Sequence, residues 1–198
     1  MRKGVETLSL QEASLIEQSK AGNIESFEQL IIAHQKKAFN IAYRILGNLE
    51  DANDVTQEAL LKAYRGINKF NGKSSFSTWL YAIVNNACMD FIRKNRKTTV
   101  THLDREYETE EGSYKAQVYS DEDTPEAVLE KKEVQRLVNE AINKLSYEHR
   151  KIIVLRDIQQ FSYQEIAQML NCSEGTVKSR ISRARTNLKT LIQEKLEA

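Results

Sequence analysis

Apolar residues recur at intervals of three and four along most of this chain, and polar residues fill the positions between them. That spacing is typical of helices that bury one face. In the N-terminal half it predicts three helices, which run from Phe27 to Ile45, from about Glu50 to Ile67 and from about Ser77 to Lys97. Gly47 is placed to end the first helix, and Ser77 is placed to cap the third. Alternating β-branched residues are scarce, so we expect no substantial sheet.

The helical pattern is interrupted between residues 98 and 126, where apolar residues are sparse and carboxylates outnumber Arg105 and Lys115. Such a composition is typical of a disordered segment. Helical spacing returns after Pro125. The chain is therefore predicted to be all-α, with two small helical domains joined by a flexible acidic linker. The predicted parts are a flexible N-terminus (residues 1–13), a first domain (14–97), the linker (98–126) and a second domain (127–198).

Residues 162–185 carry the pattern of a helix-turn-helix, a unit that places its second helix in the major groove of DNA. Ser162 and Glu165 have the spacing of a capping box at the start of the first helix. A turn follows, and Ser173 or Glu174 is suited to cap the second helix. Cap, turn and two amphipathic stripes agree with one another, which favours this unit over a merely solvated surface helix.

The second helix of this unit presents two different faces. Apolar residues form its core stripe, namely Val177, Ile181, Ala184, Leu188, Leu191 and Ile192. At about 100° per residue, the opposite arc holds hydroxyls and a cation, with further cations on its flanks. These residues are Ser179, Ser182, Arg183 and Thr186 on the arc, with Lys178 and Arg180 on the flanks. Hydroxyls and long cationic side chains suit base edges and phosphates.

The third helix of the first domain has a polar outer face. Trp79, Asn86 and Arg93 follow one another at intervals of seven and therefore lie nearly in line. Asn86 offers both a donor and an acceptor, which suits a base edge. The preceding loop is small and polar, and it lies between Phe70 and Phe76. A polar loop beside aromatic and cationic residues suits extruded single-stranded bases, although a core role is the ordinary alternative for Trp79.

The second helix of the first domain has a mostly acidic and polar face beside Leu61, formed by Asp51, Asp54, Gln57, Glu58 and Lys62. Negative charge on this face disfavours DNA. Composition leaves two interpretations open, a solvated surface or a face that docks on another protein.

Composition narrows the function without identifying it. The net charge of +1 hides a strong internal partition, and a DNA backbone senses local charge. Cys88 and Cys172 lie in apolar helical contexts, so we expect buried free thiols and no metal or cofactor. We find no signal-peptide pattern and no apolar run of ~20 residues, so we expect a cytoplasmic protein with no membrane insertion of its own.

Two stretches of the first domain, Ile45–Tyr64 and Phe76–Ala87, resemble region 2 of bacterial RNA polymerase sigma factors, and Leu145–Leu188 resembles region 4. The segments occur in the family's order with no third domain between them, which is similar to the extracytoplasmic function (ECF) group of the sigma-70 family. The resemblance implies a non-enzymatic subunit that binds core RNA polymerase, directs it to specific promoters and promotes DNA melting. It also implies control by an anti-sigma factor.

The resemblance implies roles for individual residues. Docking on the β′ clamp helices of the polymerase is assigned to Asp51, Asp54, Gln57, Glu58 and Leu61. Binding of the minus-ten element is assigned to the loop residues Asn71, Gly72, Lys73, Ser74 and Ser75, to Asn86, and to Arg93, Arg96 and Lys97, with Trp79 on the same face. Recognition of the minus-thirty-five element is assigned to Lys178, Ser179 and Arg183, and phosphate binding beside it to Thr176, Arg180 and Arg185.

Three further points follow from the resemblance. The β flap is an expected partner in core polymerase, and the acidic linker is expected to thread toward the active-site cleft and the RNA exit path. Promoter DNA is expected to bind in both double-stranded and single-stranded form. The family loop often carries an acidic residue at the position of Lys73, so we expect a different base preference at the minus-ten element.

Two other classes of function are weighed against this one. A conventional DNA-binding regulator with a receiver domain requires alternating strands and helices, whereas residues 14–97 are predicted to be helical throughout. An enzyme requires a catalytic constellation, and the sequence has no Gly-rich phosphate loop, nucleophile elbow or His/Cys metal cluster. His34, His102 and His149 are scattered, and each is expected to be a surface or helix residue.

Overall fold

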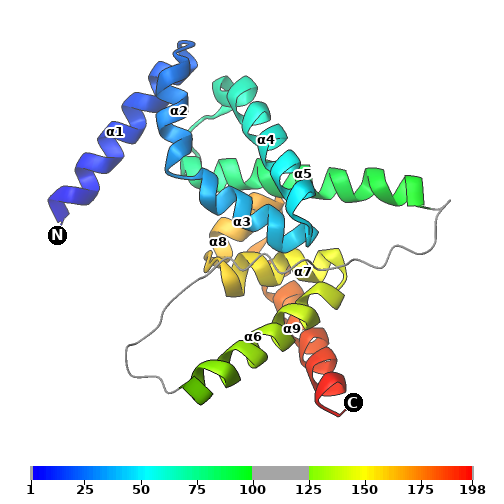
Figure 1. The fold of residues 1–198 in the computed structure, drawn as a ribbon. Coiled ribbons are helices and arrows are strands. Elements are labelled where there is room, and N and C mark those ends of the chain that lie inside the picture. The colour runs from blue at the N-terminus through cyan, green and yellow to red at the C-terminus, as the bar shows by residue number, and fades with distance from the viewer. Residues whose placement is uncertain (1, 100–124, 198) are drawn as a thin grey trace. The chain divides into compact units, whose positions relative to one another are not determined.

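The computed structural model describes the backbone of residues 2–99 and 125–197, and the side chains of residues 10–95 and 133–197. Within these ranges the chain is helical and has no strand, which confirms the predicted all-α fold (Figure 1). In chain order the elements are α1 (Arg2–Lys20), α2 (Ile24–Ile32), α3 (Gln35–Leu46), α4 (Leu49–Gly66), the 3-10 turn η1 (Ile67–Lys69), α5 (Phe76–Thr99), α6 (Pro125–Lys144), α7 (Tyr147–Ile153), the π-helical turn η2 (Val154–Ile158), α8 (Tyr163–Leu170) and α9 (Glu174–Leu196). The predicted linker, residues 98–126, lies outside the described residues except at its two ends.

The chain divides into two units, one built mainly from the residues up to 105 and the other mainly from the residues after it. In the first unit α4 and α5 pack on α3 and on each other, and α1 packs on α2. Branched apolar side chains fill this core, among them Ile41, Ile45, Val55, Leu80 and Val84. Residues 2–13, within the N-terminus that the sequence predicts to be flexible, belong to α1.

The single helix predicted from Phe27 to Ile45 is wrong, because the structure has two helices there, α2 and α3, that break at Ala33 and His34. The His34 N–H donates to the Ile31 carbonyl at 2.8 Å. The His34 Nδ1 lies 3.2 Å from the Tyr81 hydroxyl on α5, so the break is fixed by a tertiary contact. Burial lowers the pKa of His34, which favours a neutral ring at this contact.

A glycine and short polar side chains define the helix ends of the first unit. Gly47, at φ +80°, ends α3 as predicted. Asn48 then caps α4 by accepting a hydrogen bond from the Asp51 N–H at 3.0 Å. The cap of α5 is Ser75 and not the predicted Ser77, because the Ser75 Oγ accepts from the Thr78 N–H at 3.1 Å.

Two buried threonines of the first unit differ in how their hydroxyls are satisfied. The Thr78 hydroxyl lies 2.8 Å from the Ser75 Oγ. The Thr56 Oγ1 on α4 is buried and has no hydrogen-bond partner among the described residues. A buried hydroxyl that makes no hydrogen bond has lost its hydration without compensation.

Replacing Thr56 by valine is therefore expected to stabilise the first unit by about 1 kcal/mol, because the change removes an unsatisfied hydroxyl and keeps the side-chain shape. Thr78→Val is the matched control and is expected to destabilise the unit, since Thr78 is equally buried but hydrogen-bonded. Chemical denaturation of both variants measures the difference. Equal destabilisation by the two substitutions would show that Thr56 has a partner after all.

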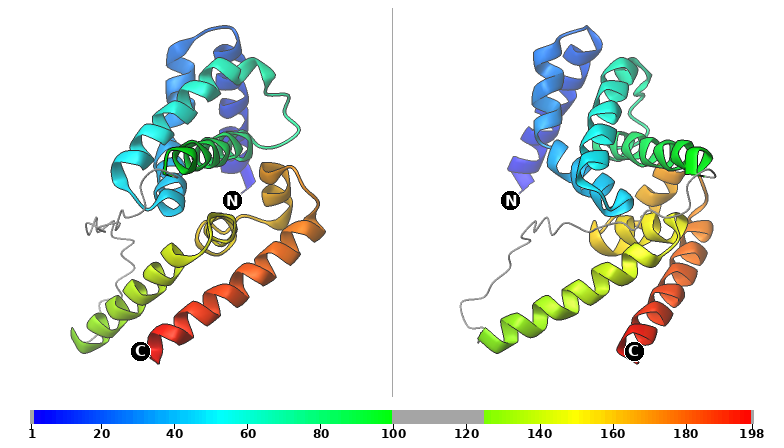
Figure 2. Two further views of the ribbon diagram at one scale, coloured as in Figure 1. Left: turned by 90° about the vertical axis from the view of Figure 1, so that its right-hand side faces the viewer. Right: turned by 45° about the vertical axis from the view of Figure 1, so that its right-hand side comes forward.

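In the second unit, α6 and α9 lie side by side in both views of Figure 2, and α7 packs on α9. An ion pair between Lys195 and Glu140 links the C-terminal part of α9 to α6. The Asn187 amide lies 3.0 Å from the His149 Nδ1 and links the middle of α9 to α7. These contacts, with the buried Ile152, hold α9 against the rest of the unit.

Arg150 joins α6 to α7 from inside this unit. It is buried, and its guanidinium donates to the carbonyls of Ile142, Asn143 and Leu145. Those carbonyls lie in the last turn of α6 and just after it, where a helix leaves acceptor capacity unused. The Ile142 carbonyl also accepts from the Leu145 N–H at 3.1 Å. The positive charge also complements the negative end of the helix dipole. Arg150 therefore caps α6 and fixes the turn into α7.

Candidate nucleic-acid interface and docking face

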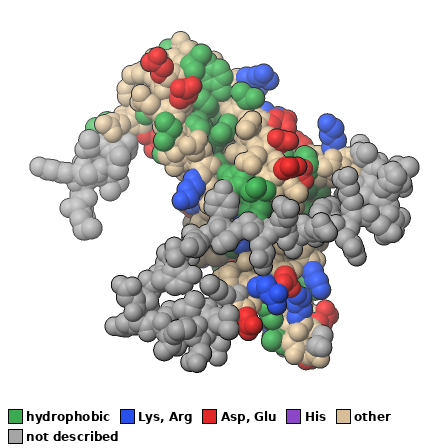
Figure 3. All heavy atoms as spheres, in the orientation of Figure 1, with side chains coloured by type: hydrophobic (Ala, Val, Ile, Leu, Met, Phe, Trp, Pro, Cys, Tyr) green, Lys and Arg blue, Asp and Glu red, His purple; other side chains and the backbone are tan. Residues whose placement is uncertain are grey.

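The exposed face of α4 is an acidic and polar row with one apolar residue in it. Glu50, Asp54, Gln57 and Leu61 follow at intervals of four, three and four, which places them in line along the helix. Leu61 is 55% exposed and creates an apolar contact point among these polar residues. Figure 3 shows acidic side chains over α4 with hydrophobic side chains beside them. This face has the composition of a protein-docking surface more than that of a DNA-binding one.

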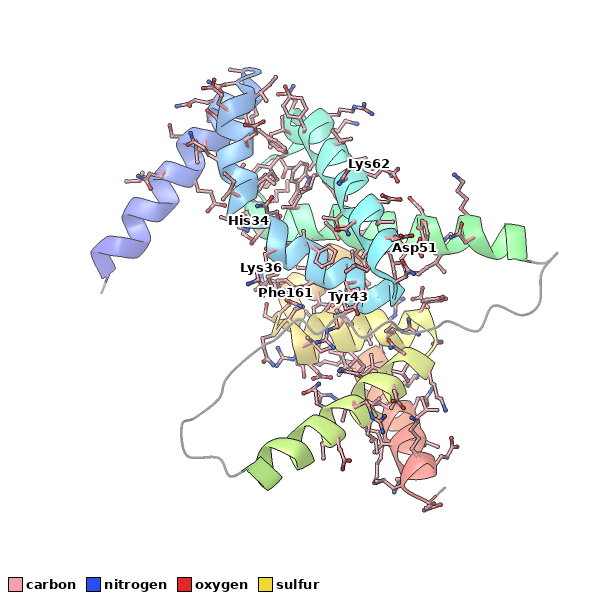
Figure 4. The ribbon with its side chains drawn as sticks, in the orientation of Figure 1. His34, Lys36, Tyr43, Asp51, Lys62 and Phe161 are labelled. Carbon is pink, nitrogen blue, oxygen red and sulfur yellow. The ribbon has the colours of Figure 1, made fainter. Side chains whose placement is uncertain are left out.

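Further residues flank this row. Asp51 and Lys62 mark the two ends of the face in Figure 4. The Lys62 Nζ lies 2.8 Å from the Glu58 Oε1, and this hydrogen bond lowers the pKa of Glu58. Leu49, at the start of α4, is 44% exposed and was missed by the sequence analysis. Its signal was an apolar residue directly after the cap Asn48, where no core contact requires one.

The loop before α5 is held by its own short-range hydrogen bonds. The Asn71 Oδ1 accepts from the Lys73 N–H at 3.1 Å, and Gly72 takes a left-handed φ of +72°. The Ser74 hydroxyl donates to the Ser75 carbonyl at 3.2 Å. Asn71, Gly72, Lys73 and Ser75 are exposed and Ser74 is half-buried. The loop therefore presents polar groups to solvent in a defined turn.

Phe70 and Phe76, which flank this loop, form an aromatic cluster with Trp79. The Trp79 ring lies 5.4 Å from Phe70 and 5.7 Å from Phe76, measured between ring centroids. Lys20, near the end of α1, places its ammonium 5.9 Å from the centre of the Phe70 ring. Trp79 thus has a structural role, since its ring contacts the residues at both ends of the loop while remaining partly exposed.

Two consecutive asparagines of α5 differ in exposure. Asn86 is exposed, whereas its neighbour Asn85 is buried and its Oδ1 has no hydrogen-bond partner among the described residues. Arg93 is exposed and lies 3.3 Å from Asp90. The structure thus leaves Asn86 accessible on the same helix face as Trp79. The side chains of Arg96 and Lys97 lie outside the described residues.

The predicted start of α8 is confirmed in atomic detail. The Glu165 Oε2 accepts from the Ser162 N–H at 2.8 Å and from the Ser162 hydroxyl at 2.7 Å, while the Ser162 Oγ accepts from the Glu165 N–H at 3.2 Å. This reciprocal pattern is a capping box. Ser173 caps α9, since its Oγ accepts from the Thr176 N–H at 3.1 Å.

The α9 helix keeps the two predicted faces. Val177, Ile181 and Ala184 are buried, and Leu188, Leu191 and Ile192 are half-buried. The candidate DNA-binding residues Lys178, Ser179, Arg180, Arg183 and Arg185 are exposed, and Thr176 is half-buried. The structure therefore leaves all of the candidate cations exposed on one helix, on its outward arc and its two flanks.

Two of these cations contact residues just before α8 and at its first position. Asp157 forms a bidentate ion pair with Arg185, which raises the pKa of the Arg185 guanidinium. The Lys178 ammonium lies 5.8 Å from the centre of the Tyr163 ring. On the α9 helix Lys178 and Arg185 lie one above the other, seven residues apart, so both contacts fall on one flank. Asp157 and Tyr163 could not be predicted from the sequence, because their partners are 28 and 15 residues away.

The cysteines differ from each other in burial. Cys88 is buried as predicted, and burial raises the pKa of its thiol to about 12, which disfavours the reactive thiolate. Cys172, in the turn before α9, is only half-buried, so the prediction of a buried thiol is wrong for Cys172. No cluster of His, Cys, Asp and Glu that could hold a metal ion occurs in the part of the chain that the structure describes. None of the described helices is both long enough and apolar enough to cross a membrane.

Comparison with known sequences identifies both halves of the chain. The model of sigma-70 region 2 matches residues 30–98, and the model of sigma-70 region 4 matches residues 135–188. The chain is 36% identical over 180 residues to the ECF RNA polymerase sigma factor SigW of Bacillus subtilis, covering 90% of this chain and 95% of that protein. It is 33% identical over 187 residues to the RNA polymerase sigma-H factor of Pseudomonas aeruginosa, covering 92% and 94%.

Two solved structures are similar over most of their length. One is the sigma factor RpoE from Bartonella quintana in complex with the anti-sigma factor NepR, with a TM-score of 0.65, 25% identity, and coverage of 86% of this chain and 98% of that one. The other is CnrH in complex with the cytosolic domain of CnrY, with a TM-score of 0.64, 26% identity, and coverage of 93% and 98%.

The fold and the comparisons define a sigma factor of RNA polymerase. The chain belongs to the ECF group of the sigma-70 family.

Proposed function

We propose that this sigma factor docks on core RNA polymerase through the exposed face of α4, with Leu61 as an apolar contact. The observation that carries the proposal is the row of Glu50, Asp54, Gln57 and Leu61, in which a mostly exposed leucine follows acidic and polar groups on one helix face. An apolar contact ringed by polar groups is the usual anatomy of a protein interface. Asp51 and Glu58 extend the same face and complete the contact with the β′ clamp helices. The second unit contacts the β flap.

DNA binding is divided between the two units. The loop Asn71–Ser75 captures a flipped base of the minus-ten element, and Asn86 and Arg93 continue that surface along α5 with Arg96 and Lys97. Trp79 supports the loop through its contacts with Phe70 and Phe76. The free energy of binding unpaired bases then stabilises the melted strand without nucleotide hydrolysis.

The second unit recognises the minus-thirty-five element through α9. Arg183 and Ser179 face outward from the buried stripe and contact base edges, with Lys178 beside them. Thr176, Arg180 and Arg185 hold phosphates. Arg185 is paired with Asp157 in the free protein, so a phosphate binds to the guanidinium donors that Asp157 leaves unused.

Docking on core polymerase also explains how two small DNA-binding surfaces can together bind a promoter. The boundaries proposed for the domains, residues 14–97 and 127–198, leave the linker 98–126 between them. Core polymerase fixes the separation of the two surfaces and raises the effective concentration of the second once the first is bound. Free in solution, the chain is expected to bind DNA weakly.

Regulation and location complete the proposal. The RpoE of Bartonella quintana is found in complex with the anti-sigma factor NepR, and we extend that type of control to this chain. An anti-sigma factor that covers the α4 face excludes polymerase from it. The chain acts in the cytoplasm with core polymerase, and it has no catalytic activity of its own.

Two substitutions are expected to separate docking from melting. Leu61→Asp places a charge at the apolar contact of the α4 face and is expected to weaken binding to core polymerase at least tenfold, since a few such contacts dominate interface energies. Asn86→Ala is expected to leave core binding unchanged and to reduce open-complex formation. Fluorescence titration with core enzyme and permanganate reactivity of promoter thymines measure the two steps.

Each variant is the control for the other. Both residues are exposed, so both variants are expected to fold as the parent does. Equal loss of core binding and melting by Asn86→Ala would contradict its assignment to the minus-ten element. Unchanged core binding by Leu61→Asp would contradict the assignment of the α4 face.

A further inference from the structure

The aromatic ring of Tyr163 lies between the two parts of the helix-turn-helix unit. Tyr163 is the first residue of α8 and follows the capping residue Ser162, so the capping box fixes its backbone. Its ring is half-buried, and two cations lie close to it. The Arg156 guanidinium carbon is 4.7 Å from the ring centre, and the Lys178 ammonium is 5.8 Å from it. Both distances are within the range of cation–π attraction.

Arg156 is itself held in place. It lies in the π-helical turn η2, and its Nη1 donates to the Phe161 carbonyl at 2.6 Å. The guanidinium and the capping box therefore set the position of the Tyr163 ring from two sides. Lys178, in contrast, has a long and flexible side chain on an exposed part of α9. The ring is the contact that restrains the Lys178 ammonium.

We propose that Tyr163 is a positioning residue for Lys178 and thereby determines specificity at the minus-thirty-five element. The proposal rests on the proposed function, in which α9 recognises that element. A lysine ammonium is a compact charge with no preferred direction, so an unrestrained Lys178 exchanges between base edges and phosphates. Held by the ring, the ammonium is directed to one place, and less conformational freedom is lost on binding.

The neighbouring contact on the same flank acts differently. Asp157 neutralises Arg185 with a carboxylate, whereas Tyr163 restrains Lys178 without neutralising it. Lys178 therefore keeps its full charge for DNA, and its side chain approaches DNA from a fixed side of α9. Loss of the ring is expected to relax sequence preference while the sequence-independent attraction to phosphates persists.

The experiment uses holoenzyme assembled from the full-length chain and a promoter library with a randomised upstream element. Sequencing of the bound DNA gives the preference at each base pair. Lys178→Ala first defines which positions depend on Lys178. At those positions Tyr163→Leu is expected to lower the preference roughly two- to fivefold, the range of an exposed cation–π contact. Tyr163→Phe keeps the ring and is expected to behave as the parent.

Several outcomes would overturn the inference. These are an unchanged preference in Tyr163→Leu, a uniform loss at all positions, an equal loss in Tyr163→Phe, or an effect of Tyr163→Leu that persists in the Lys178→Ala background. Absence of any upstream preference in the parent holoenzyme would instead contradict the proposed function itself.

A measurement on the free chain tests the geometry without DNA. Ring currents are expected to shift the Lys178 ε-methylene protons upfield in the parent and in Tyr163→Phe, and Arg156→Met is expected to reduce that shift by loosening the ring. An unshifted Lys178 signal in the parent would overturn the inference, whether or not Tyr163→Leu folds.

Discussion

Arg150→Met is expected to destabilise the second unit by about 3 kcal/mol, the cost of removing a buried charged donor from several acceptors. Methionine retains much of the stem volume, so the loss reports on the guanidinium. The carbonyls of Ile142, Asn143 and Leu145 lose a shared donor, and the buried Leu145 backbone becomes less well satisfied. The turn from α6 to α7 then loses the hydrogen bonds that Arg150 makes across it.

Amide hydrogen exchange along α7 and α9 measures this loss in the second unit alone, which matters because a chain of two units need not unfold in one step. Arg136→Met is the control, since the Arg136 side chain is 74% exposed and its Nε lies 3.8 Å from Glu140. Its effect is expected to stay within about 0.5 kcal/mol. Equal effects of the two substitutions would contradict the structural role of Arg150.

Arg183→Ala is expected to lower discrimination at the minus-thirty-five element by about 1–3 kcal/mol, the contribution of a good base contact. Arg183 lies on the outward arc of α9, opposite the stripe of Val177, Ile181 and Ala184. A long cationic side chain at that position reaches into the major groove, where guanine offers two acceptors to one guanidinium.

Arg180→Ala is the comparison for this effect, because Arg180 is equally a surface arginine of α9 but lies on a flank. It is expected to weaken binding to all sequences alike and to lower the salt dependence of binding by about one phosphate. Competition binding of holoenzyme to matched and mismatched promoters distinguishes the two variants. A uniform loss in Arg183→Ala would make Arg183 a phosphate contact.

The features of this fold that sequence analysis predicted correctly are local. Ser162 and Glu165 are three residues apart, and Ser173 lies three residues before the N–H that it caps, so each signal is complete within one turn of chain. The apolar stripe of α9 is likewise a repeat along one helix. Such features depend little on the rest of the molecule.

The features that sequence analysis missed depend on tertiary contacts. The break at His34 is fixed by Tyr81, which is 47 residues away. Ser75 and Ser77 are equally good caps by residue type, and only the packing of Phe76 into the core decides between them. Periodicity carries no information on either point.

The candidate sites divide in the same way. The exposed α4 face and the cations of α9 could be predicted, because solvent-facing polar positions stand out against an apolar period. Which of those cations is held by a neighbour could not, since Asp157 and Tyr163 meet Arg185 and Lys178 only in the folded unit. The basic residues of α9 look equivalent in the sequence, but in the structure Lys178 and Arg185 are held by neighbouring side chains.

Run-off transcription with purified bacterial core polymerase, with and without this chain, on a pool of promoter fragments tests the central claim most directly. Transcripts that require the chain and share two spaced upstream elements are the expected result. Binding to a two-fold symmetric duplex site in the absence of polymerase, with no stimulation of transcription, would contradict the assignment and indicate a conventional regulator.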